Sequence, residues 1–334
     1  MATLNLLGGA VTWIDLWKTI DPSGGLAQIY NETLETNNIF THSVWMPANQ
    51  GATHQGVRVA SLPVSSGKRM GIGTAPTSGS HVNFVEETRV RELWVEIEDE
   101  VLNKHPDPEG YLNEQMMLSI QAISQDVVQD ALYGNRATDP DNINGLLVRY
   151  GSIQTDRKQG RVMSAGGSSN ANSSIIALKW GGDGVFMIYP KDHPTAGLTK
   201  ELFPAENITS STGLIKRVRR MRVQFAFGIG VNNRRNFFRL ANIDASISAA
   251  NWVLNVENNL ITLFNDAPND AMGFRMYVNN FVKTQFDIRA KDKTNVYYNP
   301  MGNYIGQPPG QTALFNGLPM YKTERLIAAE ANVT

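Results

Sequence analysis

Cysteine is absent from all 334 residues of the chain. Its absence excludes disulfide bonds, cysteine nucleophiles, iron–sulfur clusters and thiolate zinc sites, and it agrees with assembly in a reducing cytoplasm. The sequence also has no uninterrupted apolar run long enough to span a bilayer, and no basic region precedes the apolar residues of its first 21 positions. We therefore expect a soluble, unexported protein that has no membrane partner.

An excess of charge of either sign is missing as well. Lys and Arg number 30 and Asp and Glu number 31, so the net charge is −1. A protein that binds duplex DNA tightly needs many cations to neutralise the phosphates. The overall charge does not support that role, but it is compatible with a local basic patch. Hydrophobic residues make up 42% of the chain, as in ordinary globular proteins. The length suits one large domain or two to three modest ones.

Strong catalytic motifs are also lacking. The sequence has no GxSxG nucleophile motif, and its two glycine-rich stretches, GIGT and GGDG, lack the frames of phosphate-binding loops. None of the five histidines pairs with another at a metal-binding spacing, and we expect surface or loop positions for them. These histidines are His42, His54, His81, His105 and His193. The sequence thus predicts no catalytic residue, no metal and no cofactor.

An extended β-hairpin is predicted within residues 41–95. Two runs rich in β-branched and aromatic residues flank a Gly-, Ser-, Thr- and Pro-rich stretch at 65–80. A hairpin alone is marginally stable in water, so we expect it to pack on something else, with another copy of the chain as one candidate. Residues 1–40 read as an arm that needs a partner surface to cover Trp13 and Trp17. The alternative for this segment, an ordinary edge of the core, is equally compatible with the pattern.

A single long helix is predicted over residues 108–133. Asp107 is suited to cap it, Pro108 fits its first position, and Gly134 follows its end. Apolar residues recur inside it at steps of three and four. The helix could be a mechanical strut or a plain core helix, since both give this pattern.

The remainder of the chain alternates strands with shorter helices. Residues 214–231 and 234–244 read as a strand pair with Asn232 and Asn233 at the turn between them. Residues 245–264 and 279–291 have helical patterns. Gly317 to Pro319 interrupt the final strand, and the tail beyond it is expected to be helix-like or frayed.

Two charged clusters invite both functional and structural interpretations. Glu96, Glu98 and Glu100 are predicted to share one strand face. They could form a metal-binding or acid–base cluster. We favour a solvated face or a set of salt-bridge partners for arginines of another subunit. The basic run at 216–222, with Arg217, Arg219 and Arg222, is the densest cation cluster. Nucleic-acid contact is one interpretation, but a strand would divide these charges over two faces. We favour pairing with carboxylates across a subunit boundary.

Six segments in the second half of the chain carry a family resemblance when they are taken in order. They are Lys179–Gly181, Ile188–Lys191, Arg234–Asp244, Met276–Asn279, Asp292–Val296 and Phe315–Pro319. The ordered set resembles the major capsid proteins of short-tailed phages of the epsilon-fifteen-like type. The chain departs from the family pattern at Asn236–Phe238, where Trp-Arg-Tyr is expected.

The resemblance implies an α+β fold of the Hong Kong 97-like type, with an N-terminal arm, an extended β-hairpin loop, a long spine helix, and peripheral and axial domains. We place the arm at 1–40, the hairpin loop at 41–95, the peripheral domain with the spine helix at 96–245, and mainly the axial domain with the C-terminal strand at 246–334. We expect a strand order after the helix that is rearranged relative to the type member of the fold.

The implied function is self-assembly into pentamers and hexamers of an icosahedral phage head around double-stranded DNA, in the virion. Implied partners are other copies of the chain, scaffolding, portal and cement proteins, and DNA through non-specific contacts. The rival interpretations are an encapsulin-type compartment, a carboxylate-based hydrolase, and a tail or baseplate component. The residues expected at subunit contacts are Trp13, Trp17, Arg58, Lys68, Arg69, Glu96, Glu98, Glu100, Arg217, Arg219 and Arg222.

Overall fold

The computed structural model describes residues 38–156, 159–193, 195–209, 213–244, 247, 249–290, 298–299 and 313–334. They form two compact units. The first contains residues 90–127 and 193–226, and the second contains residues 38–89, 128–192 and 227–334. Trp13, Trp17 and nearly all of the predicted arm lie outside the described residues.

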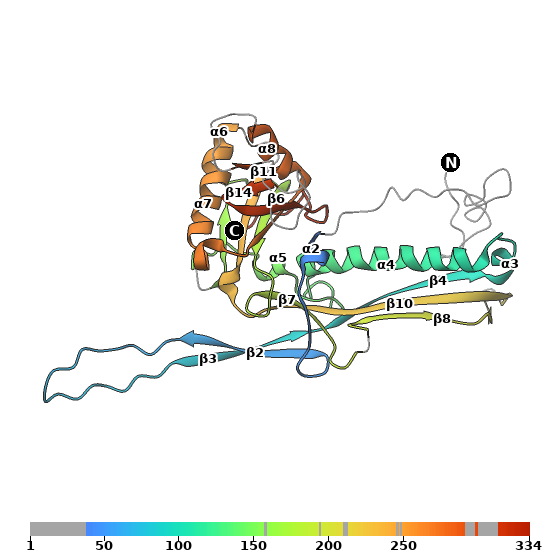
Figure 1. Cartoon of the computed structure of the whole chain (residues 1–334), viewed down its shortest axis with the longest axis horizontal. Helices are drawn as coiled ribbons and strands as arrows, with labels where there is room; N and C mark the ends of the chain where they lie inside the picture. Colours follow the sequence, from blue (N-terminus) through green and yellow to red (C-terminus); the bar gives the residue numbers. More distant parts are fainter. Residues whose placement is uncertain are drawn as a thin grey trace. The chain divides into compact units, whose positions relative to one another are not determined.

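The first unit is a sheet covered by a helix (Figure 1). Strand β10 (Ile215–Val231) is hydrogen bonded to β4 (Arg89–Glu98) and, antiparallel, to β8 (Leu198–Leu202) and β9 (Glu206–Thr209). The short helix α3 (Asp99–Leu102) follows β4, and the long helix α4 (Pro108–Tyr133) comes next. The buried side chains between the helices and the sheet include Ile97, Val101, Leu102, Tyr111, Leu112 and Met221. Among the described residues, this apolar cluster lies between the helices and one face of the sheet.

Helix α4 begins and ends where the sequence predicted. Asp107 Oδ1 accepts a hydrogen bond from the backbone N–H of Gly110 at 3.0 Å, which satisfies one of the free donors of the first turn. At the other end, a Cβ at Gly134 would lie 2.5 Å from the carbonyl oxygen of Asp130 and 2.6 Å from that of Ile143. Only glycine allows the chain to leave the helix by this route.

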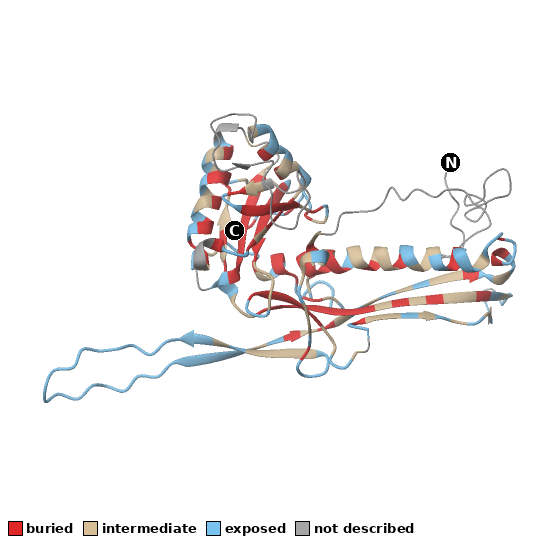
Figure 2. Ribbon diagram, viewed as in Figure 1, coloured by how far each residue is buried: buried red, intermediate tan, exposed pale blue. Residues whose placement is uncertain are grey.

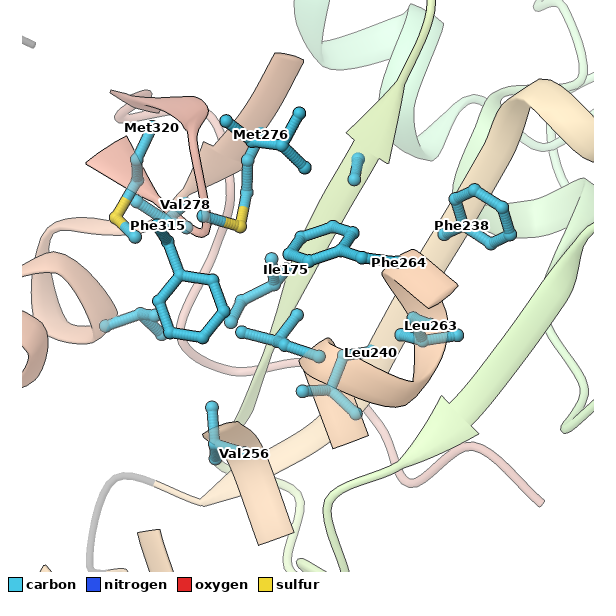
Figure 3. Close-up of a cluster of buried hydrophobic side chains, with 14 of the residues drawn as sticks. Ile175, Phe238, Leu240, Val256, Leu263, Phe264, Met276, Val278, Phe315 and Met320 are labelled. Atoms are coloured by element: carbon cyan, nitrogen blue, oxygen red, sulfur yellow. The ribbon is translucent and has the colours of Figure 1, made fainter. Parts of the chain in front are cut away.

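The second unit is built on a seven-stranded sheet in the order β13-β14-β15-β12-β6-β11-β5. The sheet shares one apolar core with four helical segments, which are α6 (Ala249–Trp252), a π-helical turn (Val253–Glu257), α7 (Asn258–Asn265) and α8 (Asn280–Ala290). The short helix η4 (Pro268–Ala271) follows α7. Figure 3 shows this core, in which Phe264 and Phe315 meet side chains from several strands. The strands are β5 (Arg161–Ser164), β6 (Asn172–Leu178), β11 (Phe237–Asp244), β12 (Arg275–Val278), β13 (Tyr298–Asn299), β14 (Ala313–Phe315) and β15 (Leu318–Lys322).

The predicted hairpin is present in the second unit as β2 (Thr53–Ser61) and β3 (Ser80–Glu87). Every residue from 60 to 83 is exposed, including the whole tip between the strands (Figure 2). Thr88 interrupts the extended chain between β3 and β4. Its N–H and its hydroxyl both donate to the carbonyl oxygen of Ala52. The unit also contains α2 (Asn38–His42), α5 (Leu146–Arg149) and β1 (Trp45–Pro47), which pairs in parallel with β7 (Val185–Tyr189).

The predicted hairpin of residues 214–244 is wrong. Strand β10 pairs with β7 at its C-terminal end, whereas β11 pairs with β5 and β6 in the other sheet. Asn233 caps the 3₁₀ helix η2 (Arg234–Asn236), and the side chain of Asn232 donates to the carbonyl oxygen of Gly182 at 2.5 Å. These contacts open the turn and send the chain from one sheet to the other.

The C-terminal tail is neither helical nor frayed. Asn316 and Gly317 take left-handed conformations in the turn between β14 and β15, and the chain then runs on without a helix to Thr334. The backbone of Val333 exchanges hydrogen bonds with the side chain of Asn242 at 2.8 and 2.7 Å. The tail is therefore part of the second unit's packing.

Candidate assembly surfaces

The hairpin exposes apolar side chains on both of its faces. Directly opposite residues in paired antiparallel strands share a face, so Val57, Val59 and Val85 lie on one side and Val82 on the other. These four valines are between 53% and 61% exposed. The tip adds the exposed side chains of Leu62, Val64, Met70 and Ile72. Such a concentration of uncovered apolar surface marks an interaction site.

The base of the hairpin is held by arginine contacts within the second unit. The Arg58 guanidinium lies 3.7 Å from the centre of the Phe84 ring and donates to the carbonyl oxygens of Val231 and, at 3.1 Å, Asn232. Burial and the neighbouring Arg234 lower the pKa of Arg58. A Cβ at Gly56 would lie 2.2 Å from the Phe84 ring, so glycine makes room for this stack. Arg58, predicted at a subunit contact, thus has intrachain partners.

Two ion pairs continue this attachment at the end of β3. Arg149 Nη1 lies 2.6 Å from Glu86 Oε1, and Arg136 Nη1 lies 2.8 Å from Glu87 Oε2. By contrast, Lys68 and Arg69 are exposed in the tip. The strands are therefore fixed at one end and presented to solvent at the other.

The face of the first unit's sheet that points away from α4 carries a network of charges. Side chains alternate along β4, so Glu92, Trp94 and Glu96 lie opposite the core positions Val95 and Ile97. We call this surface the charged face. It consists of Glu92, Trp94, Glu96, Glu201, Phe203, Glu206, Lys216, Arg220 and Arg222.

Each cation of the charged face has an acidic partner in the same chain. Glu96 pairs with Lys216 at 2.5 Å and with Arg220 at 3.3 Å, and Arg222 bridges Glu92 at 3.0 Å and Glu201 at 3.3 Å. Hydrogen bonds from Trp94 and Arg222 lower the pKa of Glu92. The Trp94 ring is half exposed and stacks on Phe203 with 5.5 Å between ring centres. The face combines satisfied charge with an open aromatic surface.

The arginines predicted at subunit contacts also find acids close by. Arg217 and Arg219 both reach Asp99, at 3.5 and 3.1 Å, and Arg219 reaches Glu109 at 3.3 Å. The prediction that three glutamates share one strand face is wrong for Glu100. Strand β4 ends at Glu98 and helix α3 begins at Asp99, so Glu100 leaves the sheet. Glu98 and Glu100 are exposed.

A buried polar network escaped prediction from the sequence. Arg239 on β11 donates to Ser174, to the carbonyl oxygens of Leu147 and Tyr150, and to Glu330 in the C-terminal tail. Glu330 also accepts a hydrogen bond from the Tyr133 hydroxyl at the end of α4. Burial is the main cause that raises the pKa of Tyr133. No local pattern signals this network because its members are far apart in sequence.

Metal-binding clusters of His, Cys, Asp and Glu do not occur among the residues that the structure describes. The five histidines do not form a common group: His42 contacts Tyr277, His105 packs on Tyr111, and His81 is exposed on the hairpin. Of the helices in the described part, none is long and apolar enough to cross a membrane.

Comparison with known proteins gives a consistent result. The family model described as major capsid protein GP7 matches residues 21–334. The structure of bacteriophage Epsilon15 matches with a TM-score of 0.72 and 20% identity over 99% of this chain and 100% of that chain. The bacteriophage JBD30 capsid matches with a TM-score of 0.52 and 13% identity over 88% and 91%. No curated protein matches the sequence.

A weaker match is the holo-SrpI encapsulin complex from Synechococcus elongatus PCC 7942. Its TM-score is 0.45 and its identity 10%, over 66% of this chain and 94% of that chain. Similarity of this extent supports no conclusion about the chain.

Proposed function

The chain belongs to the GP7 family of major capsid proteins, and from this premise we propose that it assembles as pentamers and hexamers into an icosahedral phage head around double-stranded DNA. As a major capsid protein it forms the capsid of the virion. Its α+β fold is of the Hong Kong 97-like phage capsid type, in agreement with the Epsilon15 and JBD30 matches.

The observation that carries the proposal is the uncovered hairpin. Among the strands that the structure describes, β2 and β3 pair only with each other, and residues 60–83 are all exposed. Burying one valine or leucine side chain is worth about 1.5–3 kcal/mol, so the exposed apolar residues of the hairpin represent a large unused stabilisation. A lattice of identical copies would cover this surface without any other partner. Many modest contacts in such a lattice add through high effective concentration.

The domain division is also part of the proposal. The seven-stranded sheet takes β5, β6 and β11 from before residue 246 and β12 to β15 from after it. We therefore assign these three strands to the axial domain, together with residues 246–334. The first unit, with β4, most of α4 and most of β10, corresponds to the peripheral domain. We therefore propose that the boundary between the peripheral and axial domains is set by the seven-stranded sheet and not by residue 246.

The remaining partners follow from the role of a phage head. Scaffolding, portal and cement proteins are proposed to contact the shell, and the DNA is proposed to touch it without sequence readout. A net charge of −1 suits a shell that contacts DNA weakly over a large area. Exposed Lys68, Arg69, Glu98 and Glu100 remain proposed subunit contacts.

A deletion in the hairpin tests the proposal. Removing Ser65–Ser80 takes away the exposed tip, whose side chains are in no core. The variant should keep the circular dichroism spectrum and unfolding midpoint of the parent but form no shells under negative-stain electron microscopy. A matched control replaces the polar tip residues Ser65, Ser66 and Thr77 by alanine and should still assemble. Normal shells from the deletion variant would refute the proposed role of the hairpin.

A further inference from the structure

A polar hollow of about 180 Å³ lies in the second unit between the end of α5 and the η2 turn. Its lining includes Arg149, Tyr150, Ser152, Gln154 and Arg234. By this measure one water needs roughly 10–15 Å³, so the hollow has room for a carboxylate side chain and several waters.

The floor of the hollow is rigidly supported. The Tyr150 ring stacks on Phe237 with 4.1 Å between ring centres, and Arg239 donates to the Tyr150 carbonyl oxygen at 2.8 Å. Gly160 has a φ of +83°, and a Cβ there would lie 2.5 Å from the Tyr150 ring. Glycine thus allows the wall to close against the tyrosine. A site with fixed walls can select a ligand at low entropic cost.

The hollow has more positive than negative charge around it. Arg58, Arg149 and Arg234 all act electrostatically on Tyr150, whereas the only carboxylate in this group is Glu86. Glu86 is paired with Arg149, and Arg58 donates to backbone carbonyl oxygens. Arg234 is exposed and forms no ion pair with any carboxylate in the described part of the chain. One guanidinium is therefore left to face the hollow without a counter-charge.

We propose that this hollow binds an Asp or Glu side chain of a second copy of the chain, with Arg234 as the principal partner. The inference rests on the proposed function, because it requires copies to assemble. A chain with a net charge of −1 that concentrates cations at one place carries the balancing acids elsewhere on its own surface. Exposed acids that form no ion pair in the described residues include Glu98, Glu100, Asp139 and Asp141. A guanidinium fork suits such a carboxylate well.

A DNA phosphate fits the hollow less well. Duplex DNA has one charge per roughly 1.7 Å of axis and is bound by rows of cations. Here two of the three arginines have intrachain partners, and a single position at the hollow remains. The arrangement suits one carboxylate better than a polyanion.

Charge reversal at neighbouring positions tests the site. Arg234→Glu places a negative charge at the hollow, whereas Arg235→Glu makes the same change at the next residue, which is also exposed but does not line the hollow. The first variant should lower the association constant per contact by at least about tenfold, so that particle yield collapses. The second should assemble like the parent. Both variants should keep the parent's circular dichroism spectrum, because neither side chain is buried.

Carbodiimide cross-linking identifies the partner. In assembled particles of Arg234→Lys, made from mixed ¹⁴N- and ¹⁵N-labelled copies, zero-length coupling should join position 234 to an Asp or Glu in a peptide pair of mixed isotope. The Arg235→Lys particles should not give this link. If Arg234→Lys does not assemble, the comparison of Arg234→Glu with Arg235→Glu alone decides the inference.

Several results would overturn the inference while leaving the proposed function intact. One is parent-like particles from Arg234→Glu, and another is loss of particles from both charge reversals. A third is normal shells from Arg234→Glu that contain less nucleic acid than those from Arg235→Glu, which would assign the site to phosphate. A fourth is that position 234 couples only within one copy. Failure of the parent chain itself to form shells would instead refute the proposed function.

Discussion

Arg239 and Glu330 form an ion pair of 2.9 Å although they lie 91 positions apart in the sequence, and their side chains are only 4% and 5% exposed. The pair joins β11 to the C-terminal tail. Ser174, Tyr133 and two backbone carbonyl groups satisfy the remaining polar atoms. A buried pair with this many partners fixes the position of the tail more than it adds net stability.

Glu330→Ala should destabilise the chain strongly, since it leaves the Arg239 guanidinium buried without a counter-charge. Breaking one side of a buried pair costs about 3–5 kcal/mol. The double substitution Arg239→Met with Glu330→Met should cost clearly less than Glu330→Ala. Urea unfolding followed by circular dichroism measures both. Equal losses in the two variants would contradict the account of an uncompensated charge.

Arg58→Ala should loosen the hairpin base without unfolding the chain. The substitution removes the stack on Phe84 and the hydrogen bonds to the carbonyl oxygens of Val231 and Asn232. Amide hydrogen exchange in β2 and β3 should speed up, whereas the cores should keep their protection. Lys68→Ala, in the exposed tip, is the matched control and should leave the exchange pattern unchanged. Unaltered exchange in Arg58→Ala would show that the Arg58 contacts do not hold the hairpin.

Acid should weaken the second unit through His42. Burial, with a smaller effect of Arg275, lowers the pKa of His42 to about 4 from its ordinary value of 6.5. Its Nδ1 lies 3.1 Å from the Tyr277 hydroxyl, and its ring packs on Tyr321. Because the unfolded chain takes up the proton first, the contribution of His42 is complete above pH 6.5 and is lost as the pH falls towards 4.

The measurement is the unfolding midpoint of His42→Gln and the parent between pH 7.5 and 4. The variant should lose less stability over this range than the parent does. His81→Gln, on the exposed hairpin, should follow the parent. A His42 variant with the parent's full pH dependence would mean that other groups, such as His54, whose pKa burial also lowers, account for it.

Glu98→Lys combined with Glu100→Lys should separate assembly from folding. Both side chains are exposed, so the unfolding midpoint should stay close to that of the parent, whereas shell yield should fall if they contact another copy. Glu96→Ala is the contrasting variant, since it unpairs Lys216 and Arg220 within the chain and should lower the midpoint slightly. Parent-like shell yield from the double variant would remove these residues from the proposed contacts.

The sequence predicted the elements that carry their own signals. Asp107, Pro108 and Gly134 mark both ends of α4, and the β-branched runs around the polar tip mark the hairpin. The strand partners of β10 and β11 could not be predicted in this way. The Asn232–Asn233 pair is typical of a tight turn, but Asn232 donates to the carbonyl oxygens of Gly182 and Gly184 and Asn233 caps η2 instead.

The charged clusters could be identified from the sequence, but their partners within the chain could not. The pairing of Arg217 and Arg219 with Asp99, or of Arg58 with backbone carbonyl groups, depends on long-range folding. Arg234 was predicted to begin a strand, and its place beside a polar hollow follows from a loop more than 70 positions earlier. Tertiary contacts of this kind leave no periodic trace in a sequence.

Cryo-electron microscopy of particles formed by the purified chain tests the central claim most directly. The account predicts closed icosahedral shells with pentamers and hexamers, in which the β2–β3 hairpin of each copy lies on a neighbouring copy. Rings or tubes would indicate a tail or baseplate component, and a small oligomer with an uncovered hairpin would contradict assembly into a shell.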